Sequence, residues 1–220
     1  MSTVYDCNNE ASRAAGLNAA RGALKAGRLV VVPTDTVYGI AADAFDSDAV
    51  TSLLRAKGRG RDMPVPVLVG SWTTIDGLVA SVRPEARELI RAFWPGGLSL
   101  VVHQAPSLAW DLGDTRGTVM LRMPLHPVIL ELLREVGPLA VSSANVSGRP
   151  PAANVTEARE QLGASASVYL DGGPAEHGIA STIVDLTGDR PRILREGAVT
   201  AEALAEVLGD DPERLRSGGE

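Results

Sequence analysis

The stretch LVVVPTDTVYG at residues 29–39 decides the fold. Its first four residues, Leu29 to Val32, form a short apolar run that does not alternate with polar residues. Such a run is typical of a strand buried on both faces of an α/β sheet. Because ligands bind at the carboxyl ends of strands in these sheets, the hydroxyl groups of the following turn are a candidate binding site. An ordinary turn capped by Asp35 would use the same residues.

Helical and extended patterns alternate on both sides of this stretch. Helices are predicted over 10–26, 46–57, 84–93, 127–136, 156–162 and 200–207, with a further start at Ser71 or Thr73. Strands are predicted at 29–32, 67–69, 98–103, 118–123, 139–142, 167–170, 181–186 and 191–195. This order indicates the α/β class. The last three strands have no helix between them, so we expect a mixed parallel and antiparallel sheet.

The length of 220 residues is typical of one domain. We expect a single catalytic domain over 1–207, followed by a short tail over 208–220 that is acidic and polar. The composition of this tail predicts a flexible segment.

Composition excludes several classes of protein. The longest apolar run has four residues, and a membrane-spanning helix needs about 20. The start, MSTVYDCNNE, lacks the pattern of a secretory signal, and Cys7 is the only cysteine, so we expect a cytoplasmic protein without a disulfide or cysteine zinc site. The net charge of −6 is unlike that of a general nucleic-acid binder.

The common nucleotide and hydrolase motifs are missing from the sequence. It contains no GxxxxGK[ST], GxGxxG, GxSxG or HExxH pattern. The segment KGRGR at 57–61 offers another way to bind phosphate, because a lysine and an arginine one glycine apart suit a polyphosphate. Cations at the end of a helix also complement its dipole, so a structural cap is the alternative.

Polar side chains also follow the predicted strand at 139–142. The segment SSANVSG at 142–148 carries hydroxyl and amide groups that bind phosphate oxygens or base edges, or that form an ordinary turn. Thr118 and Arg122 lie four apart on one strand and therefore share a face, where the arginine is either a carboxylate clamp or a surface charge. Arg192 and Arg195 flank another short strand.

The order of these segments is more specific than any one of them. PTDTVYG, KGR, VLV, TVMLRMP with HP, SSANVSG, ASTIVDL and ILREG together resemble the YrdC-like family of threonylcarbamoyl-AMP synthases, of the single-domain type, over about residues 20–197. The resemblance implies a twisted mixed sheet, flanked by helices, around a large concave cationic pocket. It implies that L-threonine, bicarbonate and ATP condense to threonylcarbamoyl-AMP and pyrophosphate.

The resemblance also implies partners. The product would pass to a tRNA threonylcarbamoyl transferase complex that modifies adenosine 37, with at most weak direct contact between this chain and tRNA. Mg²⁺ would enter with ATP, held through the phosphates, and no protein side chain is identified as a metal ligand.

Site residues follow from the matching motif positions. The catalytic signature falls on Lys57, Arg59, Ser143 and Asn145. ATP contacts would fall on Arg59, Met63, Thr118, Ser143, Pro151 and Arg195. Contacts with L-threonine would fall on Thr36, Leu68, Arg122, Val141 and Ser181.

The sequence departs from the family pattern at three places. Met63 stands where an asparagine often meets the nucleotide, Leu68 stands near a position where a histidine often faces threonine, and SSAN replaces PSAN. Three rival functions therefore stay open. They are a non-enzymatic RNA-binding module, a paralogue that makes a different carbamoyl-adenylate, and the carbamoyl-adenylate module of hydrogenase-maturation proteins.

Overall fold

The computed structural model describes residues 2–175 and 178–217. Its strands are β1 (Thr3–Asp6), β2 (Leu29–Val32), β3 (Gly39–Asp43), β4 (Val67–Leu68), β5 (Leu98–His103), β6 (Thr118–Arg122), β7 (Leu139–Ser143), β8 (Ala166–Asp171), β9 (Thr182–Asp185) and β10 (Arg192–Arg195). Its α-helices are α1 (Glu10–Lys25), α2 (Ser47–Lys57), α3 (Ile75–Leu78), α4 (Pro84–Phe93), α5 (Pro127–Val136), α6 (Val155–Leu162), α7 (Ala201–Leu208) and α8 (Pro212–Ser217).

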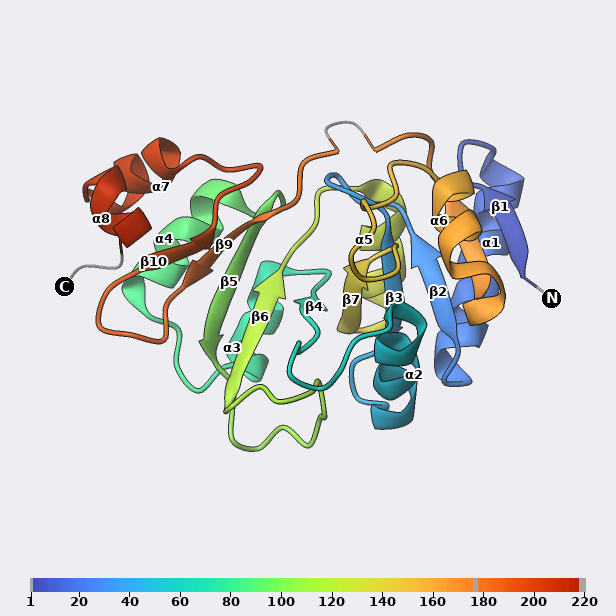
Figure 1. The fold of residues 1–220 in the computed structure, drawn as a ribbon, viewed down its shortest axis with the longest axis horizontal. Helices are drawn as coiled ribbons and strands as arrows, with labels where there is room; N and C mark the ends of the chain where they lie inside the picture. Colours follow the sequence, from blue (N-terminus) through green and yellow to red (C-terminus); the bar gives the residue numbers. More distant parts are fainter. Residues whose placement is uncertain (1, 176–177, 218–220) are drawn as a thin grey trace.

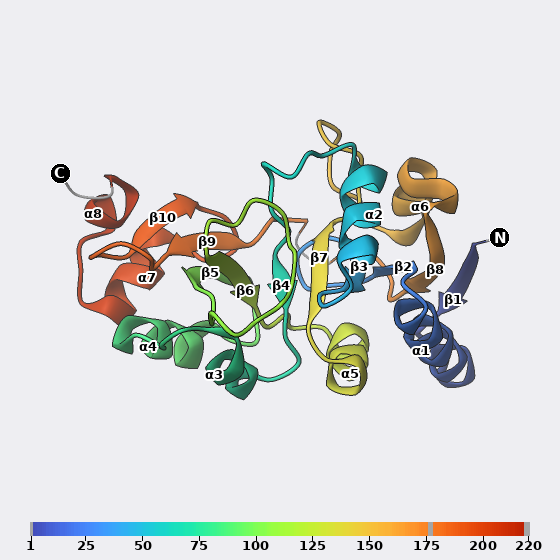
Figure 2. The same ribbon diagram turned by 90° about the horizontal axis from the view of Figure 1, so that it is seen from below.

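All ten strands join one twisted sheet in the order β1-β8-β2-β3-β7-β4-β6-β5-β9-β10 (Figure 1). β2 pairs with β8 in parallel and with β3 antiparallel, and β9 pairs with β5 in parallel and with β10 antiparallel. The predicted mixed α/β sheet is therefore confirmed. Figure 2 shows α1, α3, α4 and α5 on one side of the sheet and α2 and α6 on the other.

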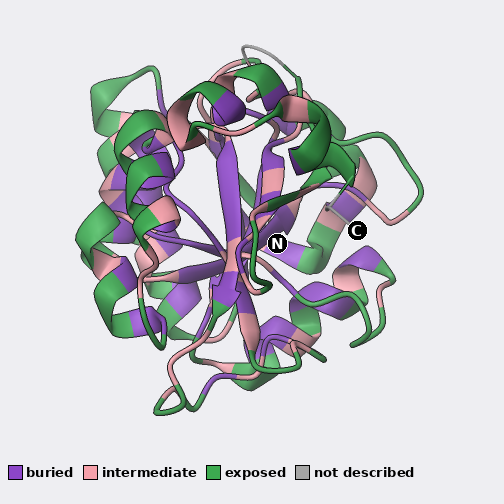
Figure 3. Cartoon of the chain, turned by 90° about the vertical axis from the view of Figure 1, so that its left-hand side faces the viewer, coloured by how far each residue is buried: buried purple, intermediate pink, exposed green. Residues whose placement is uncertain are grey.

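The apolar run that starts the 29–39 stretch lies in the interior. All four residues of β2 are at most 4% exposed, as expected for a strand covered on both faces. Figure 3 shows the same burial along the strands, with exposed residues on the outward sides of the helices. The turn after β2 leads back into β3, so residues 33–38 connect two antiparallel neighbours.

Local signals explain the helix ends. The Asn9 side chain accepts a hydrogen bond from the Ser12 amide at 3.0 Å, and α1 starts there. Asp46 caps α2 in the same way, and α2 ends at Gly58 with a φ of 65° in the left-handed region that glycine favours. His126 caps α5, since its Nδ1 accepts from the Val128 amide at 3.3 Å.

Two strands escape sequence reasoning. β3 reads GIAAD, with too few β-branched residues for a strand signal, and its pairing with β2 and β7 forms it. β1 is a largely exposed edge strand without an apolar face, held by its parallel partner β8.

The predicted flexible tail differs from what the structure shows. Residues 212–217 of the 208–220 segment form α8, and Leu215 is 1% exposed beneath it. One buried leucine in a polar stretch was too weak a signal to reveal a packed helix. Residues 218–220 lie outside the described part of the chain. Within the described ranges, no helix is long and apolar enough to cross a membrane.

Candidate active site

A cavity of about 340 Å³ opens where the turn after β2 meets the ends of β6 and β7 and the start of β9. Ten of the predicted site residues line it: Thr36, Arg59, Met63, Leu68, Arg122, Val141, Ser143, Pro151, Ser181 and Arg195. Segments far apart in the sequence thus meet at one place, as the segment order predicts. The three predicted residues that do not line the cavity are Lys57, Thr118 and Asn145.

Arg122 occupies the end of β6 and is 6% exposed. Its Nη1 donates to the Thr36 hydroxyl at 2.8 Å, its Nε donates to the Gly96 carbonyl at 2.9 Å, and its Nη2 pairs with Asp35 at 2.6 Å. Three of its five N–H groups are thereby used. One N–H on each terminal nitrogen is left for a ligand carboxylate, the arrangement that bidentate recognition needs.

The turn over residues 33–38 presents the two threonines toward Arg122. The Thr34 hydroxyl donates to the Val37 carbonyl at 2.6 Å and lies 3.1 Å from the Thr36 hydroxyl. Asp35 does not cap this turn. Its Oδ1 instead accepts from Arg122 and from the Leu125 amide at 3.0 Å, so Asp35 orients the arginine.

Lys57 ends α2 and is fully buried behind the loop that follows β7. Its Nζ donates to the Ser143 carbonyl, to the Asn145 carbonyl at 2.8 Å and to the Asn145 Oδ1 at 3.2 Å. Burial, with the neighbouring Arg59 charge, lowers the pKa of Lys57 to about 7. The structure therefore brings Lys57 to the signature loop rather than to the cavity wall.

Asn145 fixes the same loop from within. Its Nδ2 donates to the carbonyls of Val146 at 3.0 Å and Arg149 at 2.7 Å, and the residue is 5% exposed. The Val146 amide in turn donates to Gln161 Oε1 of α6 at 3.1 Å. Lys57 and Asn145 thus hold Ser143 at the cavity without lining it themselves.

Arg59 reaches the cavity from the glycine-flanked segment after α2. Its Nε donates to the Ser147 hydroxyl at 3.0 Å and its Nη1 to the Ser142 hydroxyl at 3.3 Å. Neutral hydroxyl partners leave its charge uncompensated. Burial lowers the pKa of Arg59, an effect that a bound anion would offset.

Arg195 lies at the end of β10. Its Nε and Nη2 donate to the Ser181 carbonyl at 3.0 and 2.7 Å, and Nη2 lies 3.2 Å from the Ser181 hydroxyl. That hydroxyl lies 2.9 Å from the Ser99 hydroxyl of β5. Two serines therefore set the position of Arg195 without neutralising its charge.

The cavity is electropositive although the chain carries a net charge of −6. Three guanidinium groups line it, from Arg59, Arg122 and Arg195, and no Asp or Glu is among its described lining residues. Among the residues that the structure describes, only Arg122 of these three has a carboxylate partner. A cavity of this kind attracts and holds anions such as phosphates and carboxylates.

Residues at which the sequence departs from the family pattern line the cavity. Met63 is 45% exposed at the cavity, and Leu68 and Val141 are 5% and 7% exposed. Thr118 lies two residues beyond the lining residue Met120 on the same face of β6. Its hydroxyl donates to the Thr115 carbonyl at 2.7 Å, and the structure does not bring it into the cavity.

Sequence reasoning missed the residues that orient the arginines. Asp35, Ser99, Ser142 and Ser147 bond Arg122, Ser181 or Arg59. Ser99 offered a signal, since a lone hydroxyl within the apolar strand LSLVVH needs a partner when buried. The other three stood in segments that the sequence marked as polar turns.

Metal ligands form no cluster in the described part of the chain, since no three His, Cys, Asp or Glu side chains there gather around one point. The carboxylate beside the cavity, Asp35, is engaged by Arg122. The described residues therefore offer no cage for a bare divalent cation.

Comparisons with known proteins show relatives that are similar in sequence over most of the chain. A Mycobacterium tuberculosis protein named "Putative threonylcarbamoyl-AMP synthase" is 67% identical over 215 residues, which cover 98% of this chain and 99% of that protein. The threonylcarbamoyl-AMP synthase of Pyrococcus abyssi is 35% identical, over 87% of this chain and 56% of its own length.

Solved structures share the fold. The crystal structure of P. abyssi Sua5 complexed with L-threonine superposes with a TM-score of 0.88 at 32% identity, covering 96% of this chain and 61% of that one. The crystal structure of E. coli YciO has a TM-score of 0.83 at 21% identity, over 93% of this chain and all of that one, which shows the fold alone. The profile of the Sua5/YciO/YrdC family, described as "Telomere recombination", matches residues 22–197, and the chain belongs to this family.

Proposed function

We propose that this chain is a threonylcarbamoyl-AMP synthase, which condenses L-threonine, bicarbonate and ATP. The convergence of three guanidinium groups on one cavity carries this proposal, because two substrates bear carboxylate or bicarbonate charge and the third a triphosphate. The relatives named as such synthases, and the threonine in the P. abyssi structure, support it.

The reaction needs no nucleophile from the protein. The threonine amine and bicarbonate form a carbamate with loss of water. A carbamate oxygen then attacks the α-phosphorus of ATP, and the bond to the bridging oxygen of pyrophosphate breaks. The protein has to hold the reactants in line and stabilise the negative charge of the transition state.

The cavity residues divide between the two halves of this task. Arg122 and Thr36 would hold the threonine carboxylate, with Leu68, Val141 and Ser181 around the amino acid. Arg59, Ser143 and Arg195 would contact the phosphates, with Met63 and Pro151 closer to the nucleoside. Thr118 lies outside the cavity and has no place in this division. Lys57 and Asn145 would act on the reaction through the loop that they hold, a role different from the direct phosphate contact that the motif alone suggested.

Mg²⁺ would neutralise phosphate charge when it enters with ATP. No side chain of the described residues is assigned to it, and every step above is carried by Arg, Ser and Thr groups. We also propose that residues 1–207 form the catalytic domain, that the product passes to a tRNA threonylcarbamoyl transferase, and that direct contact with tRNA is weak.

A pyrophosphate-release assay tests the proposal. Release should require ATP, Mg²⁺, bicarbonate and L-threonine together, and omission of any one should abolish it. Arg59→Ala should abolish release, whereas Arg21→Ala, which removes an exposed ion pair with Glu135, should leave it intact. Release that continues without threonine would point to an ATPase or to another carbamoyl-adenylate.

A further inference from the structure

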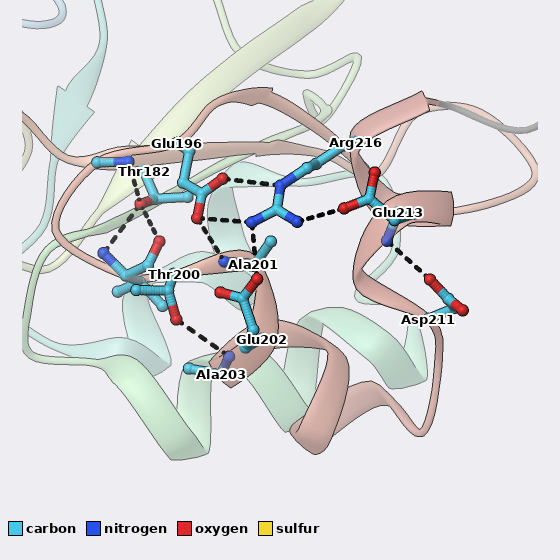
Figure 4. Close-up of polar contacts among 11 residues, drawn as sticks. Thr182, Glu196, Thr200, Ala201, Glu202, Ala203, Asp211, Glu213 and Arg216 are labelled. Atoms are coloured by element: carbon cyan, nitrogen blue, oxygen red, sulfur yellow. Dashed lines mark hydrogen bonds and ion pairs between the residues drawn. The ribbon is translucent and has the colours of Figure 1, made fainter.

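The C-terminal helix α8 is bound to the strand that carries Arg195. α8 contacts both β10 and α7. From α8, Arg216 reaches three carboxylates (Figure 4): its Nε lies 3.0 Å from Glu196, its Nη2 2.8 Å from Glu202, and its Nη1 2.7 Å from Glu213. Two of these acids lie outside α8, so Arg216 joins the C-terminal helix to the segment that follows β10.

Glu196 is the residue next to Arg195 and bonds both α7 and α8. Its Oε1 accepts from the Ala201 amide at 2.9 Å, at the start of α7, and both of its oxygens accept from Arg216. Successive side chains of an extended segment point to opposite faces. Arg195 accordingly lines the cavity while Glu196 faces α8.

The other side of the same segment is fixed to β9. The Thr182 hydroxyl accepts from the amides of Gly197 and Val199, both at 2.9 Å, and the Ala198 amide donates to the Ala180 carbonyl at 3.0 Å (Figure 4 draws the Thr182 contacts). Thr182 is fully buried, and Arg195 itself bonds Ser181 beside it. The segment over 195–199 therefore has two anchors, a buried one at Thr182 and a partly exposed one at Arg216.

Arg216 has a second effect on the cavity, through charge. Its guanidinium holds the pKa of Glu196 below the usual range and pairs with that carboxylate. Without Arg216, the Glu196 carboxylate would be unpaired one residue from a cationic group that lines the cavity. An unpaired carboxylate there, although it faces α8 and not the cavity, would weaken the positive potential that the nucleotide meets.

We propose, on the basis of the synthase function above, that Arg216 is a positioning residue for the nucleotide half of the site. It acts through Glu196 on Arg195, so the C-terminal helix supports the catalytic domain over 1–207 although it lies outside both that domain and the cavity. The residue belongs to the acidic C-terminal segment and lies beyond the 22–197 range that the family profile matches.

Steady-state kinetics of matched arginine variants test this proposal. Arg216→Ala should raise the KM for ATP about two- to fivefold, the range that partly exposed ion pairs give. The KM for L-threonine and kcat should stay within error, since the threonine half is held by Arg122. Arg214→Ala is the control, because Arg214 lies in the same helix, its side chain is 68% exposed, and within the described residues it pairs with Asp210 alone, at 3.9 Å.

Further variants separate positioning from general loosening of α8. Glu202→Gln and Glu213→Gln remove the two partners that lie away from Arg195 and should leave the KM for ATP unchanged. Glu196→Gln removes the carboxylate charge that Arg216 otherwise pairs with. The double variant Glu196→Gln/Arg216→Ala should therefore raise the KM for ATP by less than the sum of the two single effects. Arg216→Lys, which keeps the charge but loses the fork, should restore part of the ATP affinity.

Hydrogen exchange gives a readout that does not need activity. Amides 197–199 should exchange faster in Arg216→Ala than in Arg214→Ala, while amides of β2 and β3 should not change. A folded Arg216→Ala protein with the KM for ATP and the exchange rates of Arg214→Ala would overturn the inference. A wild-type protein that makes no threonylcarbamoyl-AMP would instead overturn the proposed function, and the exchange comparison would still decide whether Arg216 holds the segment.

Discussion

Lys57 and Asn145 are joined by two hydrogen bonds across 88 positions of sequence, from Nζ to the Asn145 carbonyl at 2.8 Å and to its Oδ1 at 3.2 Å. A third bond runs from the same Nζ to the Ser143 carbonyl. A longer contact of 3.4 Å joins Nζ to the Ser143 hydroxyl, so four oxygens share the three protons of the ammonium group. The signature lysine thus secures the signature loop, and Ser143 and Arg59 face the cavity.

Lys57→Met should disable the enzyme without direct loss of a phosphate contact. The substitution removes the Lys57 donor from four oxygens, which costs about 1–3 kcal/mol for each buried acceptor that water does not reach. Turnover should fall by at least about tenfold as Ser143 shifts, since misplaced groups lose transition-state stabilisation. Thermal unfolding and steady-state kinetics on the same protein measure both effects.

Lys25→Met is the matched control, because Lys25 is the one other lysine in the sequence and is exposed at the end of α1. It should keep wild-type turnover and stability. A folded Lys57→Met protein with full turnover would remove Lys57 from the functional site.

The lowered pKa of Lys57 predicts a pH dependence of stability. The folded-state pKa of about 7 lies below the ordinary 10.5, so between these values the unfolded chain binds the proton that the folded chain releases. The free energy of unfolding should therefore rise with pH from 7 to 8.5 in the wild type, relative to Lys57→Met. Cys7, whose pKa burial raises to about 11, is present in both proteins, so its effect on stability near pH 9 and above cancels in this difference.

Chemical denaturation of both proteins at pH 6, 7, 8 and 8.5 checks this prediction. The difference in unfolding free energy should change little below pH 7 and then move in favour of the wild type. A flat difference across the whole range would mean that Lys57 stays protonated in the folded chain.

Arg122→Ala should cost stability as well as threonine affinity. The pair with Asp35 is buried, with side-chain exposures of 8% and 13%, so removal of the arginine leaves a buried carboxylate with the Leu125 amide as a donor and without its opposite charge. Loss of one member of such a pair costs about 3–5 kcal/mol. Arg192→Ala breaks a half-exposed pair with Asp185 and should cost less than about 1 kcal/mol.

The double variant Asp35→Asn/Arg122→Met separates the two roles of Arg122. It removes the negative charge of Asp35 that has lost its arginine, and should recover much of the lost stability. The KM for L-threonine should stay high. If the affinity for L-threonine returned together with the stability, the proposal that Arg122 binds the threonine carboxylate would be wrong.

Gly197→Ala should disturb the nucleotide half of the cavity. A Cβ at this position would overlap the carbonyl oxygen of Ala180, and backbone atoms of Ser181 lie within 3.0 Å. Overpacking of this kind costs about 1–3 kcal/mol and should shift Arg195, which bonds Ser181. At Gly188 the nearest atom to such a Cβ is 4.0 Å away, so Gly188→Ala should match the wild type in ATP affinity and melting temperature.

The sequence was most informative where local chemistry determines structure. The apolar run of β2, the caps at Asn9 and Asp46, and the glycine at position 58 gave elements whose bounds agree within a few residues. The family resemblance predicted which side chains meet, and ten of the thirteen residues that it implied line the cavity. β3 could not be predicted in this way, since its pairing partners form it.

The partners of the cationic side chains were beyond sequence reasoning. Spacing alone does not show that Lys57 faces Asn145 and not the cavity, or that Asp35 leaves its turn to bind Arg122. Those contacts join residues about 90 positions apart and depend on how β2, β6 and β7 cross the sheet. The role of α8 could not be predicted for the same reason. An acidic composition does not show that one arginine, Arg216, pairs with three carboxylates.

The most direct test of the central claim is product analysis with carbon-labelled bicarbonate. The purified chain is incubated with ATP, Mg²⁺, L-threonine and labelled bicarbonate, and the products are separated and identified by mass. The account predicts a labelled adenylate with the mass of threonylcarbamoyl-AMP, formed in step with pyrophosphate and absent from an Arg59→Ala protein that is still folded. Pyrophosphate release with no label in any adenylate, or the same labelled adenylate without threonine, would contradict it.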